Sequence, residues 1–222
     1  MTASSRVAAA REEVVRVGRS LFERRYVHAS AGNISVRVDD EFLITPTDAA
    51  LGFLTSETIA HVDGTGVQRS GDRASKTLAL HRRIYAADPS ARCVIHTHAT
   101  HLVALTLLGV WRPDDILPPI TPYYVMKVGH VPLIPYHRPG ASGVVSLVEA
   151  AIHAKAADGI RLRAVMLDRL GPVVWGESPA AAMAVLEEVE ETAHLWLLTS
   201  RQPAPLCEAD ISDLRESFGA QW

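Results

Sequence analysis

Two hydrophobic periodicities alternate along this chain, and their interleaving constrains the fold more than any other feature. Apolar residues recur every three or four positions at 4–25, 75–87 and 178–199, the spacing of amphipathic helices. Short β-rich segments with two-residue alternation lie between them, as at 34–38. Helices and strands that intermix in this way predict an α/β sandwich with a mixed sheet.

The remaining elements follow from the same patterns. A hairpin through Asp39-Asp40 joins strand 34–38 to a strand at 42–45, and the Pro-rich segment 113–122 is expected to be a surface loop. We expect no domain boundary there, so residues 1–222 are interpreted as one domain. The other expected elements are a helical turn (55–58), strands (60–62, 91–96, 131–134, 164–167, 173–175) and helices (98–108, 142–156, 210–218).

Composition excludes several classes of protein. The 222 residues are 48% hydrophobic and 21% charged, as in a globular chain with one core rather than a disordered one. The 22 basic and 25 acidic residues give a formal net charge of −3 and are evenly mixed, so we expect no nucleic-acid partner. No apolar run approaches the roughly 20 residues that span a bilayer, and the N-terminus lacks the apolar core of a secretory signal.

The two cysteines bear on the cellular compartment. Cys93 and Cys207 are separated by more than half the chain and belong to no paired motif. We therefore expect both to be reduced thiols in a cytoplasmic protein, with neither a disulfide nor a redox role.

His96-Thr97-His98 is the feature with the clearest chemical meaning. It lies where a strand passes into a helix, and side chains two positions apart on a strand point to the same face. Both imidazoles could therefore bind one metal ion, and His101 follows within one helical turn. The alternative is a pair of histidines hydrogen-bonded at a sheet edge, and spacing alone does not separate the two interpretations.

Two further segments have features of an anion site. Gly32-Asn33 could present backbone N–H groups and an amide to an anionic ligand, and the alternative is a plain turn. Ser75 and Lys76 begin a helix, where free N–H groups, the helix dipole and an ammonium favour anions. An ordinary Ser N-cap with a solvated lysine fits this segment equally well. The acidic run at 187–191 is interpreted as a solvated helix face.

Four segments, taken in order, resemble the class II aldolase/adducin family over nearly the whole chain: 30–35, 44–47, 94–99 and the Glu-rich helix ending at 195–197. Three others, at 117–123, 135–140 and 171–174, resemble the 3-oxo-tetronate 4-phosphate decarboxylase branch more than the fuculose-phosphate aldolases. The resemblance implies a three-layer α/β/α sandwich with a central mixed, largely antiparallel sheet. It also implies a homotetramer with active sites between subunits and a small-molecule substrate.

The same resemblance implies roles for individual residues. The family's paired metal ligands correspond to His96 and His98, which would hold a divalent metal, usually zinc, with manganese or iron as alternatives. Such a metal acts as a Lewis acid on an enediolate. Tyr123 resembles a tyrosine that a neighbouring subunit contributes as proton donor or substrate contact. The expected substrate-binding residues are Gly32, Asn33, Thr47, Asp48, Ser75 and Lys76.

Three positions depart from the family pattern. Leu170 stands where the family has its third metal histidine, and Thr77 replaces the catalytic glutamate, so it cannot act as a carboxylate base. Asp48 replaces the glycine of a Thr-Pro-Thr-Gly loop. A carboxylate about 4 Å from a phosphate costs roughly 4 kcal/mol at an effective dielectric of about 20. Unless Asp48 turns outward, we therefore expect a substrate without phosphate at that end, or one bound in another pose.

The sequence thus predicts a metal-dependent carbon–carbon lyase, a decarboxylase of a small oxo or hydroxy acid. One alternative is a non-catalytic oligomeric scaffold of the adducin kind, because Thr77 and Leu170 remove two chemical groups together. Another is an epimerase or oxygenase that uses the metal differently. The reserve ligands for the missing histidine are His81, His101, His137 and Asp168, and the alternative favoured for each is a structural role in a local hydrogen bond.

Overall fold

The computed structural model describes residues 2–222, which form two compact units. The first unit holds Met1–His98 and Trp175–Met183, and the second holds Ala99–Val174 and Ala184–Trp222. Strand β8 (Gly171–Gly176) and helix α5 (Pro179–Leu198) each continue from one unit into the other. The interpretation of residues 1–222 as one domain stays a prediction.

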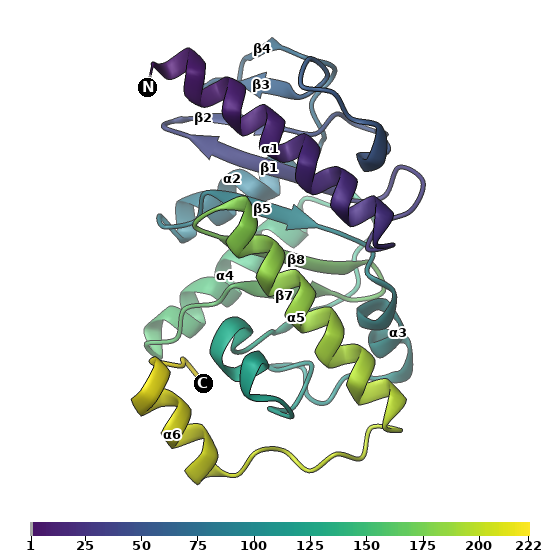
Figure 1. Ribbon diagram of the computed structural model, residues 1–222, viewed down its shortest axis with the longest axis vertical. Coiled ribbons are helices and arrows are strands. Elements are labelled where there is room, and N and C mark those ends of the chain that lie inside the picture. Colours follow the sequence, from purple (N-terminus) through teal and green to yellow (C-terminus); the bar gives the residue numbers. More distant parts are fainter. Residues whose placement is uncertain (1) are drawn as a thin grey trace. The chain divides into compact units, whose positions relative to one another are not determined.

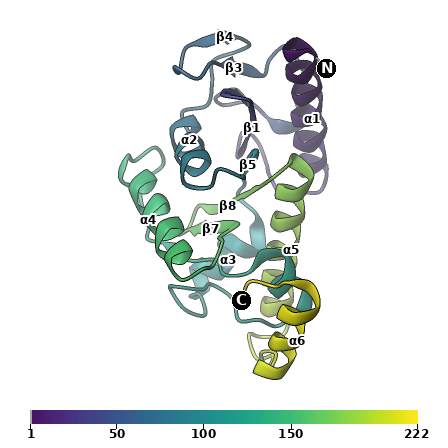
Figure 2. The ribbon, with the colours of Figure 1, turned by 90° about the vertical axis from the view of Figure 1, so that its left-hand side faces the viewer.

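The first unit is an antiparallel sheet between two helices. Its strands follow the order β4-β3-β2-β1-β5, and every neighbouring pair is antiparallel. Helix α1 covers one face and α2 the other (Figure 1, Figure 2). The apolar stripe expected for α1 is buried, with Val14, Val17 and Leu21 in the core. The elements are α1 (Ala3–Glu23), β1 (Asn33–Val38), β2 (Glu41–Ile44), η1 (Leu51–Phe53), β3 (Ala60–Val62), β4 (Gln68–Ser70), α2 (Leu78–Ala87) and β5 (Cys93–His96).

The second unit repeats this layering around three strands. Strand β6 pairs with β7 in parallel, and β7 pairs with β8 antiparallel. Helices α4 and α5 lie on opposite faces of β7 and β8 (Figure 2). Besides β8 and α5, the elements are α3 (Thr100–Leu108), the π-helix η2 (Tyr124–Val128), β6 (Leu133–Ile134), α4 (Gly143–Ala157), β7 (Ala164–Leu167) and α6 (Glu208–Phe218).

These observations confirm the predicted fold class. The eight strands form a mixed sheet in the order β4-β3-β2-β1-β5-β8-β7-β6, and only β6 and β7 are a parallel pair among the pairings described. Each unit has a helix layer, a sheet layer and a second helix layer, so the chain is an α/β/α sandwich (Figure 2).

The interpretation of segment 113–122 as a surface loop is wrong. The segment is irregular, but its middle is buried, including Ile116 and Leu117. Asp115 enters the interior with them because the His130 Nδ1–H donates to it at 2.7 Å and the Val131 N–H at 3.3 Å. The sequence patterns also missed β4 and the π-helix η2.

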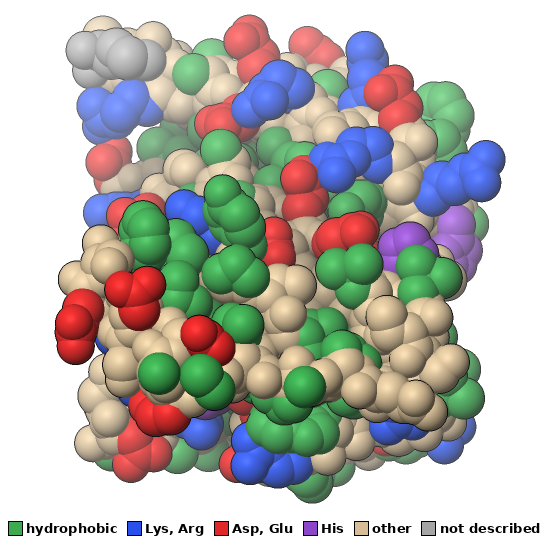
Figure 3. Space-filling model, turned by 60° about the horizontal axis from the view of Figure 1, so that its bottom comes forward, with side chains coloured by type: hydrophobic (Ala, Val, Ile, Leu, Met, Phe, Trp, Pro, Cys, Tyr) green, Lys and Arg blue, Asp and Glu red, His purple; other side chains and the backbone are tan. Residues whose placement is uncertain are grey.

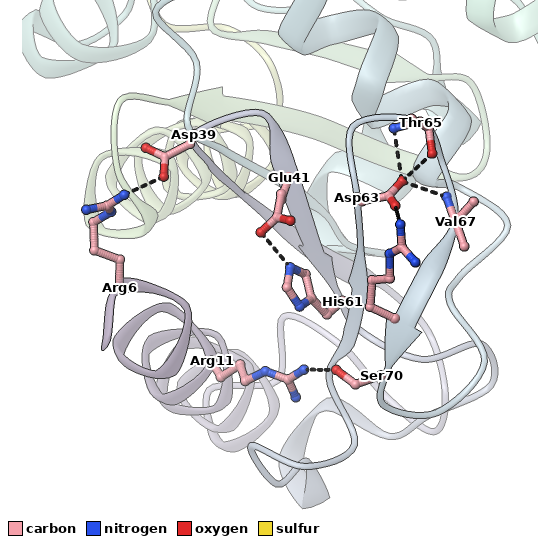
Figure 4. Close-up of polar contacts among 10 residues, drawn as sticks. Arg6, Arg11, Asp39, Glu41, His61, Asp63, Thr65, Val67 and Ser70 are labelled. Carbon is pink, nitrogen blue, oxygen red and sulfur yellow. Dashed lines mark hydrogen bonds and ion pairs between the residues drawn. The ribbon is translucent and has the colours of Figure 1, made fainter. Parts of the chain in front are cut away.

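The connection between β3 and β4 is held by one carboxylate. Asp63 Oδ1 accepts hydrogen bonds from the Thr65 hydroxyl (2.6 Å) and from the N–H groups of Thr65 and Val67 (3.0 Å each), as Figure 4 shows. Asp63 Oδ2 pairs with Arg69 at 2.5 Å. The Thr65 hydroxyl, then the Val67 N–H, keep the pKa of Asp63 well below its usual value. These contacts give Asp63 a structural role in the turn.

Charged side chains of both signs are mixed with apolar ones on the face drawn in Figure 3. Within residues 2–222, no helix combines the length and the apolarity that crossing a membrane requires. The expectation that the protein binds neither nucleic acid nor membrane stays a prediction.

Candidate active site

Two imidazoles lie beside each other where β5 ends. His96 is the last residue of this strand and is buried, and His98 follows two positions later and is half-buried. Their ring centroids are 5.2 Å apart with an interplanar angle of 65°. His28 lies on the other side of His98, with ring centroids 6.2 Å apart. All three rings belong to the first unit.

The spacing of the first two rings fits a shared metal ion. A zinc–nitrogen distance of about 2.0–2.1 Å and a tetrahedral angle place the centroids of two ligating imidazoles roughly 5 Å apart. His96 and His98 meet this condition at 5.2 Å. Among residues 2–222, however, no group of three or more His, Cys, Asp or Glu is already arranged to hold a metal ion. The described chain therefore supplies a fitting pair and an incomplete third position.

A buried hydrogen-bonded chain lies on the same face of the sheet. Ser35 Oγ is 2.8 Å from His81 Nδ1 and 2.7 Å from the Tyr85 hydroxyl, which donates to the Ser35 carbonyl at 2.9 Å. All three contacts are satisfied together when His81 Nδ1 carries the proton and donates to Ser35, which then donates to Tyr85. This assignment leaves an electron lone pair on His81 Nε2, which is buried and has no hydrogen-bond partner.

Asn33 provides a second unpartnered atom. It stands opposite His96 in the antiparallel register, so both side chains point to the face that carries Ser35 and α2. Asn33 is buried, and its Oδ1 has no hydrogen-bond partner within the described chain. Buried polar atoms are almost always hydrogen-bonded. Two unpartnered atoms on the face of His96 therefore mark a place for a water molecule or a ligand.

The surroundings of His81 and His98 favour the neutral imidazole, which is the form that can ligate a metal. Burial, and then the proximity of His96, lower the pKa of His81 to about 3. Burial, followed by His28, also lowers the pKa of His98. Neutral imidazole is the ligating form. His81 and His98 thus retain free nitrogen lone pairs at neutral pH.

The expected substrate-binding segments are drawn together by backbone hydrogen bonds. The Thr45 N–H donates to the Ile34 carbonyl at 3.0 Å, directly after Asn33. The Thr47 N–H donates to Arg73 and the Ser75 N–H to Thr45, at 2.9 and 3.2 Å. Asn33, Thr47 and Ser75 therefore belong to three adjoining segments, whereas the Lys76 side chain is exposed.

Thr77 stands at the N-cap of α2 and makes no side-chain capping bond to the helix. Its hydroxyl is instead 2.8 Å from Ser75 Oγ. Neither hydroxyl ionises at neutral pH, so neither residue replaces the family's glutamate as a carboxylate base.

Two loop positions show why the family pattern has glycine there. Gly32 has φ +84°, and a Cβ at this position would lie 2.8 Å from the His96 carbonyl oxygen, so only glycine fits. Asp48 has φ 57°, the left-handed conformation that glycine adopts without strain. The Asp48 side chain is exposed.

The reserve ligands of the second unit have other partners. Glu190 is 8% exposed, and its carboxylate accepts from His101 Nδ1 (2.8 Å) and from the N–H groups of His101 and Leu102 (2.9 and 3.0 Å). His137 Nδ1 donates to the Pro135 carbonyl at 2.7 Å. The solvated face expected at 187–191 therefore does not include Glu190, which caps the start of α3.

Tyr123, Leu170 and Asp168 also belong to the second unit. Tyr123 precedes η2 with 60% of its surface exposed. Leu170 lies in a hydrogen-bonded turn before β8, its N–H donating to Leu167 at 3.1 Å. The Asp168 N–H donates to Ile134 at 3.0 Å. The roles assigned to these residues stay predictions.

His28 is the neighbour of the site that the sequence patterns missed. A single histidine between a helix and a turn has no periodicity that would mark it. The available signal was its position four residues before Gly32, in the segment that leads into the expected anion-binding turn.

The fold and the histidine pair define a class that comparison with known proteins makes explicit. The Class II Aldolase and Adducin N-terminal domain matches residues 12–197, so the chain belongs to the class II aldolase/adducin family. A 3-oxo-tetronate 4-phosphate decarboxylase of Cupriavidus necator is 53% identical over 217 residues, covering 96% of this chain and 97% of that protein. An L-fuculose phosphate aldolase of Haemophilus influenzae is 31% identical over 182 residues, 80% of this chain and 78% of the relative.

A solved structure gives the same placement. YgbL of Escherichia coli superposes with a TM-score of 0.83 at 36% identity, covering 94% of this chain and 99% of that one. The predicted family and branch are therefore confirmed. The prediction of a lyase is confirmed as well, because the named relatives are decarboxylases and aldolases, which are both lyases.

Proposed function

We propose that this chain is a metal-dependent decarboxylase of a small oxo or hydroxy acid. The observation that carries the proposal is the 5.2 Å spacing of the His96 and His98 rings, which fits two ligands of one divalent ion. The 53% identity to a 3-oxo-tetronate 4-phosphate decarboxylase supports the reaction type. Zinc is the first choice of metal, with manganese and iron as alternatives that use the same imidazole donors.

The replacement of the family's glutamate by Thr77 favours decarboxylation over aldol cleavage. Aldol cleavage begins when a base removes a hydroxyl proton, and Thr77 cannot accept one. Decarboxylation of a 3-oxo acid instead begins with heterolysis of the bond to the carboxylate. Carbon dioxide leaves, the electron pair stays on the carbon next to the carbonyl, and that carbon then takes up one proton. A bound divalent cation would supply Lewis-acid stabilisation for this electron pair.

The chain's own residues bind the substrate and supply the proton. His96 and His98 would hold the metal, and Gly32, Asn33, Thr47 and Ser75 would contact the polar groups of the acid. The unpartnered Asn33 Oδ1 supports a hydrogen-bonding role toward a hydroxyl group. We assign the final proton donation to Tyr123 of a neighbouring copy in a homotetramer, which its exposed side chain permits.

We assign the proposed selectivity to Asp48, which requires its exposed carboxylate to face the bound acid. Its carboxylate stands in the loop that adjoins the Ser75 segment through the Thr47–Arg73 and Ser75–Thr45 hydrogen bonds. A negative charge at this loop disfavours a phosphate there. We therefore propose an acid without a terminal phosphate as the preferred substrate. A cytoplasmic location is supported by the free thiols of Cys93 and Cys207.

The test uses untagged protein and a panel of oxo and hydroxy acids, each with and without a terminal phosphate. We expect release of carbon dioxide that is lost on chelation, returns with a divalent metal and is absent in His96→Ala. The exposed His153→Ala, on α4, is the matched control and should match the wild type. Size measurement by light scattering checks the tetramer.

Three kinds of outcome would overturn the proposal. Turnover that survives both chelation and His96→Ala would remove the metal from the mechanism. A folded oligomer without turnover or metal would instead support the non-catalytic scaffold, and metal-dependent epimerisation or oxygen consumption would support the remaining alternatives.

A further inference from the structure

The metal site needs a donor that the family correspondence does not supply. Catalytic zinc is held by three protein ligands, and the position of the third family histidine is Leu170 in this chain. His96 and His98 give two. A further ring beside this pair is that of His28, whose centroid lies 6.2 Å from that of His98 at an interplanar angle of 70°.

The backbone that carries His28 is fixed against the site. The Ala31 N–H donates to the His28 carbonyl at 2.9 Å, and Ala29 between them has φ 47°, an uncommon left-handed conformation for alanine. A Cβ on Gly32 would meet both the His96 carbonyl oxygen and Val27 Cγ1 at 2.8 Å. The turn therefore packs directly on the backbone of His96. Strained turns of this kind concentrate at functional sites.

The His28 side chain retains the freedom to complete a coordination shell. It is exposed, whereas Val27 before it is buried and anchors the turn. The ring centroids of His28 and His98 are 6.2 Å apart, compared with 5.2 Å for His96 and His98. A change of side-chain rotamer at the exposed His28 would bring its ring closer by about this difference. His81 has no such freedom, because it is fully buried and its Nδ1 is bound to Ser35.

We propose that His28 is the third nitrogen ligand of a divalent metal centre whose other protein ligands are His96 and His98. The inference rests on the proposed metal dependence and extends it to a residue outside the family's ligand set. The centre takes a divalent cation with a preference for imidazole, such as zinc or cobalt, and leaves a fourth position for an oxygen of the substrate. His28 thereby compensates for Leu170.

The test is metal binding by the full, untagged chain after removal of metal with a chelator. Calorimetric titration with Zn²⁺ and visible absorption with Co²⁺ report affinity and coordination without any substrate. We expect His28→Ala to weaken Zn²⁺ binding by about 100-fold and to change the Co²⁺ spectrum. His28→Gln, which keeps a polar side chain in the exposed turn, should weaken binding equally. His153→Ala should leave the affinity unchanged.

Nitrogen NMR of the histidine rings adds an independent readout. In the wild type, three imidazoles should shift on addition of one equivalent of Zn²⁺, and only two in His28→Gln. If His96→Ala abolishes binding while both His28 variants bind as the wild type does, His28 is not a ligand and the proposed function stands. If His81→Gln weakens binding in place of the His28 variants, His81 is the third donor and the inference is overturned. If the wild type binds no divalent ion, the proposed function fails and the inference fails with it.

Discussion

The two compact units each contain a pair of neighbouring histidines, and the pairs differ in what surrounds them. In the first unit, His96 and His98 lie 5.2 Å apart, edge to face, and the same sheet face carries the unpartnered Nε2 of His81 and Oδ1 of Asn33. In the second unit, His101 and His194 are stacked at 4.1 Å with an interplanar angle of 24°. There the carboxylate of Glu190 accepts three hydrogen bonds at the start of α3.

We interpret the pair in the first unit as a candidate binding site and the pair in the second unit as a structural contact. Unpartnered buried atoms beside a histidine pair leave hydrogen bonds that a water molecule or a ligand would complete. In the second unit the donors around the pair already have an acceptor in Glu190, so these contacts contribute to stability instead. Proximity of two histidines is therefore a weaker sign of function than the presence of unpartnered groups around them.

The largest expected effect is the loss of activity when the His98 ring is removed, and removal of the His194 ring from the other pair is the matched comparison. His98→Ala should lower kcat/KM for the best acid of the panel by about 1000-fold, roughly 4 kcal/mol, because a metal ligand is lost. His194→Ala should stay within about threefold, because its ring stacks on His101 and pairs with the exposed Glu191 at 3.6 Å, away from the proposed metal ligands. Steady-state kinetics with both variants, checked for folding by circular dichroism, make the comparison. Equal losses in the two variants would erase the distinction between the pairs.

A smaller effect, on the free energy of unfolding, is expected when Glu190 in the second unit is replaced. Glu190→Ala leaves two N–H groups of the first turn of α3 and the His101 ring without their acceptor, so it should destabilise the protein by about 3 kcal/mol. In a chain of this size that lowers the melting temperature by roughly 6–12 °C. The neighbouring, exposed Glu191→Ala should change stability by less than about 0.5 kcal/mol. A melt of Glu190→Ala that coincides with that of Glu191→Ala would show that the buried carboxylate does not cap α3.

The third prediction concerns the pH dependence of stability in the metal-free protein. His81 has a folded pKa of about 3, so in the unfolded chain it takes up a proton near its ordinary pKa of 6.5 while the folded chain does not. The unfolded state then binds more protons, and stability falls as the pH drops below about 6.5, by about 1.4 kcal/mol per pH unit from this group. Above that pH the group has no effect.

Urea denaturation at pH 7, 6 and 5, with chelator present, checks this prediction. His81→Gln has no titrating ring at the position and should show a shallower loss of stability over the same range. Equal slopes for the wild type and His81→Gln would mean that His81 is not held neutral by burial.

Most of the elements and the histidine pair could be predicted from the sequence because the signals for them are local. The stripe of Val14, Val17 and Leu21 marks a helix within a few residues, and the two-residue spacing of His96 and His98 at a strand end places their rings on one side. Glycine and asparagine at positions 32 and 33 likewise marked the turn that adjoins them.

What the sequence did not reveal depends on partners far away along the chain. Glu190 accepts a hydrogen bond from the N–H of His101, 89 residues earlier in the first turn of α3, so its run of acidic neighbours suggested only a solvated face. Asp115 became buried through its bonds to His130 and Val131, which a Pro-rich pattern does not encode. His28 reaches the ring of His98 only because the turn at Gly32 folds onto the strand end.

The smallest expected effect is a change in the free energy of unfolding at Asp48, in the loop next to the proposed substrate site of His96 and His98. Asp48 and Asp39 share the left-handed conformation, with φ 57° and 55°, so a change to glycine relieves backbone strain at either position. We expect Asp48→Gly to stabilise the protein by about 0.5 kcal/mol, since the greater freedom of glycine in the unfolded chain offsets part of the relief. Asp39→Gly makes the same backbone change in the β1–β2 hairpin but also loses the surface ion pair with Arg6 at 2.6 Å, so its net change should be near zero.

The same two variants separate strain from charge in substrate selection. If the Asp48 carboxylate repels a terminal phosphate, Asp48→Gly should raise the ratio of kcat/KM for phosphorylated over unphosphorylated acid by about tenfold, roughly 1.4 kcal/mol. Asp39→Gly removes an equal charge at the hairpin and should leave the ratio unchanged. A shift of equal size in both variants would trace selectivity to net charge, and no shift in Asp48→Gly would mean that its exposed carboxylate points away from the acid. In that case Asp48 would not explain the proposed preference for a substrate without a terminal phosphate.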